Sequence, residues 1–287
     1  MATHTRPCIV APMQSPPTPD TPDSWNAASR GYAEHVAPRM MEAFADEFAD
    51  RLDVDSTTEA LEVAAGSGAL TQVLAKRVKS LLAIDFAQGM IDILRDRMRA
   101  AGANHVTCEV MDGQALAVDD ARFDRAACSF GLMLFPNRAK GFAELRRVLR
   151  PGGRALVTGW AGPEKFEVLG IFIGAMRAAF PDMPPPLGPP PVFSLADPAS
   201  FKAQMEDAGF EDVAVDFVSR DLEVADFDAM WEMLTSGAPP VQMLFNRVGP
   251  EGKGKLRDSL AGIIENRFGS GPIRLTNVAT VGSGVAS

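Results

Sequence analysis

The stretch from Leu61 to Thr71, which reads LEVAAGSGALT, constrains the fold more than any other part of the chain. Its first residues are apolar enough for a short buried strand, and the apolar residues after Gly68 recur at helical spacing. Gly66 and Gly68 allow a sharp backbone turn and place no side chain above it. We therefore expect a strand, a tight turn and a helix whose free N–H groups face a ligand. Taken alone, the stretch is equally consistent with a turn that binds nothing.

A second apolar strand is expected over residues 80–84, and Asp85 ends it, 19 positions after Gly66. In a strand–helix–strand unit the two strands lie side by side, so Asp85 is expected beside the glycine turn. A carboxylate there can accept hydrogen bonds from both ribose hydroxyls of a nucleoside-containing cofactor. A pyrophosphate cofactor is disfavoured, because Thr71 stands where the dinucleotide fingerprint has a third glycine or alanine.

Five segments between residues 59 and 160 resemble, in order, the motifs of class I S-adenosylmethionine-dependent methyltransferases. They are the glycine-rich turn (61–71), the acidic loop after the second strand (85–90), the adenine-binding loop after the third strand (111–116), the fourth-strand segment (123–130) and the turn before the fifth strand (149–153). The resemblance is strongest to the subgroup that includes ubiquinone and menaquinone C-methyltransferases and many small-molecule methyltransferases. Ala64 departs from it, because the family has a glycine there, but alanine is small enough to keep the turn.

The resemblance implies S-adenosyl-L-methionine as the cofactor and indicates which residues bind it. Near its methionine end it places Glu62, Ala64, Gly66, Gly68, Thr71, Ser129 and Phe130. Around its adenosine it places Asp85 at the ribose, Phe86 and Met90 beside the adenine, and Asp112, Gly113 and Gln114 at the adenine amine. Trp25 and Tyr32 are expected near the pocket, since a sulfonium cation lies favourably on an aromatic face.

No catalytic side chain, general base or metal site can be identified from the sequence. In-line methyl transfer needs few such groups, because positioning alone can remove about 7–11 kcal/mol of a barrier. The preferred function is therefore transfer of a methyl group from S-adenosylmethionine to a small, partly apolar acceptor by in-line displacement. The sequence does not name the acceptor or say whether carbon, oxygen or nitrogen is methylated.

The element pattern predicts an α/β fold with a Rossmann-like, doubly wound sheet. Strands are expected near residues 60–64, 80–84, 105–110, 125–129 and 154–159, and helices near 70–78, 87–101 and 137–149. Such alternation gives a parallel sheet covered on both faces, with a ligand crevice at the carboxyl ends of the strands. Further strands over 213–218 and 277–285 complete a seven-stranded sheet, and the resemblance implies that the last is antiparallel.

We expect five segments along the chain. Residues 1–24 are rich in Pro, Thr and Ser and predict a disordered tail. Residues 25–58 predict a helical lid with an apolar stripe, for which plain core packing is the other interpretation. Residues 59–160 are expected to be the cofactor-binding core, 161–212 a helical, proline-rich insertion that forms a substrate wall, and 213–287 the strands and helices that complete the sheet.

The charge balance opposes a nucleic-acid partner. The chain has 28 Lys and Arg against 37 Asp and Glu, a net charge of −9, whereas nucleic-acid binders present a basic face. The one basic run, residues 95–99, alternates in sign and predicts a solvated helix face. No run approaches the about 20 apolar residues of a membrane span. Three sparse cysteines without zinc spacing favour a reducing compartment, so we expect a cytoplasmic protein with a small-molecule methyl acceptor.

Two other functions stay open at this stage, and so does the oligomeric state, a homodimer included. A nicotinamide-dependent oxidoreductase would use a similar fold, but the missing third glycine and the adenine-loop match argue against it. A catalytically inactive S-adenosylmethionine-binding partner subunit would carry the same motifs. The sequence offers no argument against the second.

Overall fold

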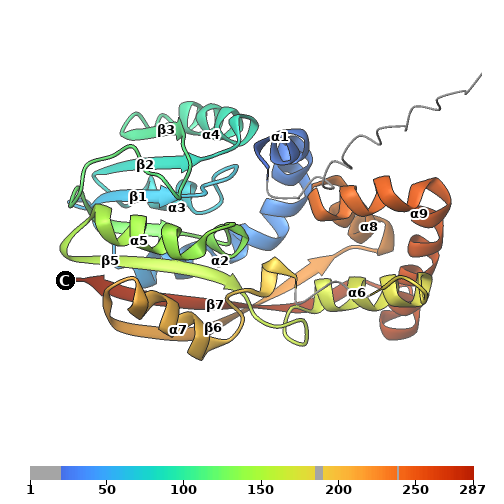
Figure 1. Cartoon of the computed structure of the whole chain (residues 1–287). Helices are drawn as coiled ribbons and strands as arrows, with labels where there is room; N and C mark the ends of the chain where they lie inside the picture. Colours follow the sequence, from blue (N-terminus) through green and yellow to red (C-terminus); the bar gives the residue numbers. More distant parts are fainter. Residues whose placement is uncertain (1–20, 185–189, 238) are drawn as a thin grey trace, which may run out of the picture.

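A computed structural model describes residues 21–184, 190–237 and 239–287. Its centre is a seven-stranded sheet in the order β3-β2-β1-β4-β5-β7-β6 (Figure 1). The strands are β1 (Glu59–Val63), β2 (Ser80–Asp85), β3 (Val106–Val110), β4 (Phe123–Cys128), β5 (Leu149–Trp160), β6 (Phe210–Val224) and β7 (Ile273–Ala286). The pairs from β3 to β5 are parallel, and β7 is antiparallel to both β5 and β6. The predicted fold class is confirmed, including the antiparallel last strand.

The parallel half of the sheet forms because its central strands are apolar on both faces. In β1 and β2 every residue after the first is buried, as expected for strands with helices above and below. Val63 pairs with Ile84, so β1 and β2 end level with each other. The residues that follow, Ala64 and Asp85, therefore lie at the same edge of the sheet, as the sequence predicted.

Helices cover the faces of the sheet and one of its ends. They are α3 (Thr71–Leu74), α4 (Gln88–Ala100), α5 (Arg138–Val148), α6 (Glu167–Ala179), α7 (Pro198–Asp207), α8 (Phe227–Ser236) and α9 (Pro239–Phe268), with short turns η2 (Leu132–Leu134) and η3 (Pro191–Phe193). Side-chain caps begin three of them: Asn137 accepts from Lys140 N at α5, Asp197 accepts from Ser200 N at α7, and Asp226 accepts from Ala229 N at α8. Among the described residues, no helix has the length and apolar content needed to traverse a bilayer.

The N-terminal segment is helical throughout, as α1 (Pro22–Gly31), the π-helix η1 (Tyr32–Met41) and α2 (Glu42–Leu52). Pro38 lies inside η1, where its missing N–H disfavours ordinary α-helical bonding. The predicted tail over residues 1–24 is wrong at its end, because α1 begins at Pro22 behind a Thr21 cap. Residues 1–20 lie outside the described part of the chain.

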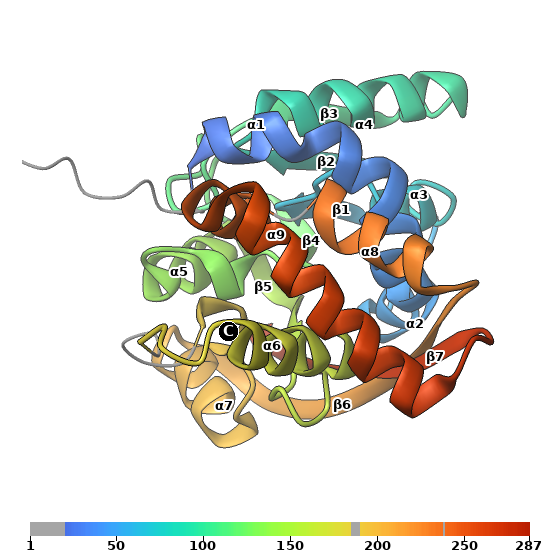
Figure 2. The ribbon, with the colours of Figure 1, turned by 90° about the vertical axis from the view of Figure 1, so that its right-hand side faces the viewer.

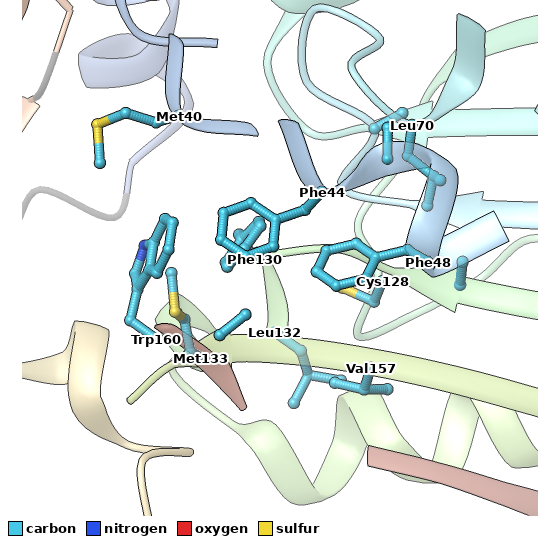
Figure 3. Packing of buried hydrophobic residues seen from close by; sticks show 14 of the residues in the cluster. Met40, Phe44, Phe48, Leu70, Cys128, Phe130, Leu132, Met133, Val157 and Trp160 are labelled. Carbon is cyan, nitrogen blue, oxygen red and sulfur yellow. The ribbon is translucent and has the colours of Figure 1, made fainter. Parts of the chain in front are cut away.

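The apolar stripe of this segment is part of the core. Phe44 and Phe48 pack on Phe130, with ring centroids 5.6 Å and 5.7 Å away, and Phe130 stacks on Trp160 at 4.1 Å (Figure 3). Val36 and Met40 are buried in the same core, so the core-packing interpretation of the stripe is confirmed. The first half of the N-terminal helical segment consists of α1 and the start of η1. It lies with α6, α8 and α9 at the end of the sheet that faces the viewer in Figure 2.

Several predicted boundaries differ from the structure. The sixth strand runs from Phe210 to Val224 instead of 213–218, because a bulge between Glu211 and Ala214 lets it pair along β7. The helix expected over 70–78 is a regular helix only over Thr71–Leu74, and turns continue its apolar spacing to the buried Val78. The proline-rich stretch expected as a loop lies partly outside the described residues, at 185–189.

Candidate functional site

A cavity of about 440 Å³ lies at the carboxyl edge of the parallel strands. We call it the outer cavity. Its walls come from α1, the start of η1, the turn after β1, the end of β2 and the loops after β3 and β4. A second space of about 40 Å³, the inner cavity, adjoins it and shares Tyr32, Ala64, Gly66, Ser129 and Phe130 with it.

Nearly all of the predicted cofactor residues line these two cavities. The outer cavity is lined by Tyr32, Ala64, Gly66, Asp85, Phe86, Met90, Asp112, Gly113, Gln114, Ser129 and Phe130, and Glu62 lines the inner cavity. Gly68 and Thr71 line neither. Segments separated by up to about a hundred positions thus converge on one edge, which is what the strand-end rule predicts.

The two glycines of the turn have different surroundings. Both adopt left-handed backbone conformations, with φ of 56° at Gly66 and 97° at Gly68. A Cβ on Gly66 would meet nothing within 4 Å, so this backbone is bare towards the cavity. A Cβ on Gly68 would lie 2.4 Å from Leu94 Cδ1, so this glycine permits close packing against α4. Only Gly66 therefore fits the contact with ligand that the sequence suggested for both.

Ala64, where the family has glycine, also adopts a left-handed conformation, with φ of 56°. Alanine pays roughly 1–2 kcal/mol for this conformation. Gly131 lies directly opposite, since a Cβ there would come within 2.3 Å of Ala64 Cβ. The absent side chain of Gly131 thus leaves room for the methyl group of Ala64, and the turn keeps its shape.

Asp85 connects the end of β2 to the glycine turn. Its Oδ2 accepts a hydrogen bond from Gly66 N and its Oδ1 accepts one from Ala87 N, both at 2.9 Å. A carboxylate offers about four acceptor positions, so each oxygen keeps one for a ligand hydroxyl. Burial raises the pKa of Asp85 to about 6, against the lowering effect of its backbone hydrogen bonds. At neutral pH the group is therefore a carboxylate that faces the cavity.

Glu62 is a second buried acid, at the inner cavity. Only 1 % of it is exposed, and Thr71 Oγ1 donates a hydrogen bond to its Oε2 at 2.7 Å. Burial raises the pKa of Glu62 to about 8, the Thr71 hydrogen bond opposes this, and the charge of Asp85 adds to it. No cationic side chain contributes. The described part of the site therefore presents two acids with no basic partner, which favours a cationic ligand.

The N-terminal helices α1 and η1 supply the aromatic side of the site. Trp25 and Tyr32, in edge contact with ring centroids 5.6 Å apart, both line the outer cavity. Burial, followed by the charge of Asp85, raises the pKa of the Tyr32 phenol far above its usual value of 10. Tyr32 therefore stays protonated at neutral pH and cannot act as a general base.

Phe130 holds a strained position where the two cavities meet. Its φ of 55° is uncommon for a bulky residue. Its ring stacks on Trp160, and its N–H donates to Thr158 Oγ1 at 3.0 Å. Such strain persists where packing over-determines a conformation, and it is frequent at ligand sites.

Comparison with known proteins agrees with this geometry. Residues 60–153 match a family model described as a methyltransferase domain. The chain is 29 % identical over 168 residues to the ubiquinone/menaquinone biosynthesis C-methyltransferase UbiE of Geobacter sulfurreducens, a match that covers 54 % of this chain and 65 % of that relative. Over residues 60–153 the chain is therefore similar to S-adenosylmethionine-dependent methyltransferases of class I. It spans slightly less than two thirds of the relative's length.

Solved structures of methyltransferases have the same fold. A protein of Bacillus halodurans, described as a candidate methyltransferase, has a TM-score of 0.56 at 18 % identity, over 84 % of this chain and 98 % of that chain. Phosphoethanolamine N-methyltransferase 2 of Haemonchus contortus, in complex with S-adenosyl-L-methionine, has a TM-score of 0.55 at 14 % identity, over 93 % of this chain and 58 % of that chain. At these identities the likeness concerns the fold alone.

The residues present suit the cofactor of this family, S-adenosylmethionine. It carries a sulfonium, an ammonium, two ribose hydroxyls and an adenine. Asp85 supplies buried negative charge, Glu62 supplies a buried acid that a nearby cation would ionise, Gly66 supplies bare backbone, and Trp25 and Tyr32 supply aromatic faces. Each of these features complements one of the ligand's groups.

Sequence reasoning missed several residues that line the cavities. In the outer cavity they are Pro22, Val110, Met111, Gly131, Leu134, Phe135 and Pro136. Most of them directly follow β3 or β4, so a systematic use of the strand-end rule would have found them. Ala37 and Met41 line the inner cavity from η1. They follow no strand, so the strand-end rule does not point to them, and only the folded structure shows that they lie at the cavity. The expected substrate wall over 161–212 contributes nothing to either cavity among the described residues.

Proposed function

We propose that this protein transfers a methyl group from S-adenosylmethionine to a small, partly apolar molecule by in-line displacement. The convergence of Glu62, Gly66, Asp85 and the loop at Asp112 on two adjoining cavities is the observation that carries the proposal. Two buried acids without a basic partner would be costly in a structure that bound no cation. A cationic methyl donor gives them a function.

Each part of the site has a proposed binding role. Asp85 accepts hydrogen bonds from the ribose hydroxyls, Glu62 accepts one from the ammonium group, and Asp112 accepts one from the adenine amine. Phe86 and Met90 flank the adenine, Gly113 and Gln114 complete its loop, and Ala64, Gly68 and Thr71 shape the turn. Ser129 and Phe130 are proposed to lie where the methionine end meets the acceptor.

The chain contributes to the reaction by positioning and by excluding water. When bound, S-adenosylmethionine supplies a methyl group that its sulfonium already activates. Tyr32 and Trp25 close the site from the lid side, while Phe130 and Leu134 bound it from the loop after β4. Holding the acceptor in line within such walls lowers the barrier without a dedicated catalytic side chain.

The acceptor is proposed to be a neutral, largely apolar molecule that is nucleophilic at neutral pH. The described lining of the outer cavity holds no Lys, Arg or His, so nothing there pairs with an acceptor's phosphate or carboxylate. Tyr32 stays protonated and does not serve as a general base for the acceptor. The names of the relatives, ubiquinone and menaquinone methyltransferases, agree with an acceptor of the quinol type.

The remaining partners are proposed on the sequence alone. The acidic balance and the apolar cavity walls argue against a nucleic-acid substrate. The sparse cysteines, of which Cys108 and Cys128 are free and buried, support a cytoplasmic location. A homodimer is compatible with all of these features.

A turnover assay with labelled methyl donor tests the proposal. Purified protein would be offered S-adenosylmethionine together with a prenylated naphthoquinol, a catechol, an amine and an oligonucleotide. We expect label on a neutral apolar acceptor, and loss of that label in Asp85→Ala. Saturable cofactor binding without turnover across such a panel would instead identify an inactive partner subunit, and label on the oligonucleotide would overturn the acceptor class.

A further inference from the structure

Arg97, on α4, contacts both the lid and the glycine-rich turn. Its Nη1 donates to the carbonyl oxygen of Ser67 at 2.9 Å, and its Nη2 donates to the carbonyl oxygen of Ala33 at 3.1 Å. Nη1 also lies 3.7 Å from Glu42 Oε1, at the start of α2. The sequence predicted a solvated face here, which is wrong for Arg97: its side chain is 27 % exposed and contacts two other elements.

The two carbonyls belong to two different segments, η1 and the glycine-rich turn, that both contribute residues to the inner cavity. Ser67 lies between Gly66 and Gly68, both in left-handed conformations, so this peptide has few intrinsic restraints. Ala33 directly follows Tyr32 in η1, and both Tyr32 and Ser67 line the inner cavity. One guanidinium therefore holds the backbone of two segments that contribute to the inner cavity.

The inner cavity also shows a polar group in need of a partner. The Ser67 hydroxyl is buried and has no hydrogen-bond partner among the described residues. Buried hydroxyls are rarely left in this state. Because Ser67 lines the inner cavity next to Glu62, the position of its peptide decides what this cavity presents to a ligand.

We propose that Arg97 is a positioning residue that holds the lid and the glycine-rich turn in register, so that lid closure and the shape of the inner cavity change together. This rests on the proposed function, in which the inner cavity takes the amino-acid end of S-adenosylmethionine. A guanidinium suits the role because its planar fork reaches two carbonyls at once, which the point charge of a lysine does not. Loss of Arg97 should mainly speed ligand dissociation, since the contacts that retain the ligand are those that loosen.

Arg99 provides a matched control on the same helix. Its side chain is 77 % exposed and pairs only with Asp96, three residues earlier, at 2.8 Å. Arg97→Ala and Arg99→Ala remove the same side chain and the same charge from α4. Any difference between the two variants therefore reflects the contacts of Arg97 with the lid and the turn.

Amide hydrogen exchange in the ligand-free protein tests the coupling directly. In Arg97→Ala we expect exchange at least about tenfold faster in both 32–36 and 66–72, with little change in the sheet. Arg99→Ala should leave both segments unchanged. Arg97→Lys should restore protection in at most one of them. Faster exchange in only one segment of Arg97→Ala, in neither, or uniformly across the chain would overturn the proposal.

Binding of S-adenosylhomocysteine supplies the second readout, by calorimetry and by stopped-flow tryptophan fluorescence. We expect Kd to rise about tenfold in Arg97→Ala, mostly through faster dissociation, and to stay unchanged in Arg99→Ala. Equal affinity in both variants would overturn the role of Arg97 and leave the proposed function intact. If the wild-type chain did not bind the ligand, the proposed function would fail, and the exchange result would still decide the coupling. Should Arg97→Ala not fold, Arg97→Lys carries both measurements.

Discussion

The parallel and antiparallel halves of the sheet bury different kinds of polar group. In the parallel half, β1 and β2 bury Glu62 and Asp85, two acids with raised pKa values and no basic partner. In the antiparallel half, β7 buries Asn277 and Thr280, which are neutral. Charge is costly to bury and neutral amides much less so. The difference indicates that the first half is built for a ligand and the second for packing.

Two of the residues with a strained backbone in the parallel half lie at the cavities, although Ala121, just before β4, does not. Ala64 and Phe130, both with positive φ, line the cavities at the ends of β1 and β4. In the antiparallel half the comparable residue, Asp212, lies at the bulge of β6, and Gly249 lies at the kink of α9. Neither of these lines a cavity among the described residues. Stability and cofactor binding should therefore be separable by mutation.

The largest expected effect is on stability, from the antiparallel half. Phe201 of α7 is fully buried, and a Cβ on Gly282 of β7 would come within 2.7 Å of its ring. Phe201→Ala should lower the free energy of unfolding by about 3–5 kcal/mol, through lost burial and a residual cavity. Urea unfolding gives this value. Affinity for S-adenosylhomocysteine, measured where the variant is still folded, should change less than about twofold, and a large loss would mean that the halves are not independent.

The next effect concerns the buried acid of the parallel half. Glu62 binds its proton more tightly in the folded protein than in the unfolded chain, so the free energy of unfolding should fall as pH rises from 4.5 to about 8. The loss should be on the order of a few kcal/mol. Glu62→Gln keeps the acceptor for Thr71 but cannot ionise, so its stability should be flatter over this range. Identical pH profiles of thermal unfolding for the two proteins would contradict the assignment.

Asp85→Ala should act mainly on binding. It removes the proposed acceptor for the ribose hydroxyls and releases Gly66 N, so affinity for S-adenosylmethionine should fall at least about tenfold. Titration calorimetry measures this. Glu223→Ala in β6, which breaks an exposed pair with Arg274, is the control and should alter neither affinity nor stability appreciably. Unchanged affinity in Asp85→Ala would remove this residue from the site.

The smallest effect is expected at Val110, at the end of β3. It lines the outer cavity and is 43 % exposed without a ligand. An adenosine in that cavity would cover it, so Val110→Ala should weaken binding about two- to fivefold, at little cost in stability. Val215→Ala, in β6, is a suitable comparison because it makes the same change away from the cavities. Equal affinities for these two variants would place the adenosine elsewhere.

The sequence predicted the positions of site residues that depend on strand order. It did not predict the surroundings of residues whose neighbours lie far away in the sequence. Asp85 was found because a strand's end and its neighbour's turn must share an edge. Gly68 was given a ligand-facing role because nothing local shows that Leu94, on α4, occupies the space behind it. Arg97 was placed in solvent because alternating signs are typical of exposed helix faces, whereas the carbonyls it binds are 30 and 64 positions away.

The most direct test of the central claim is titration calorimetry of the full chain with S-adenosylhomocysteine, beside the same titration with a nicotinamide dinucleotide. The two buried acids and the bare turn at Gly66 predict saturable binding of the first, with one ligand per chain, and no binding of the second. Binding of the dinucleotide instead, or no binding of S-adenosylhomocysteine, would contradict the account.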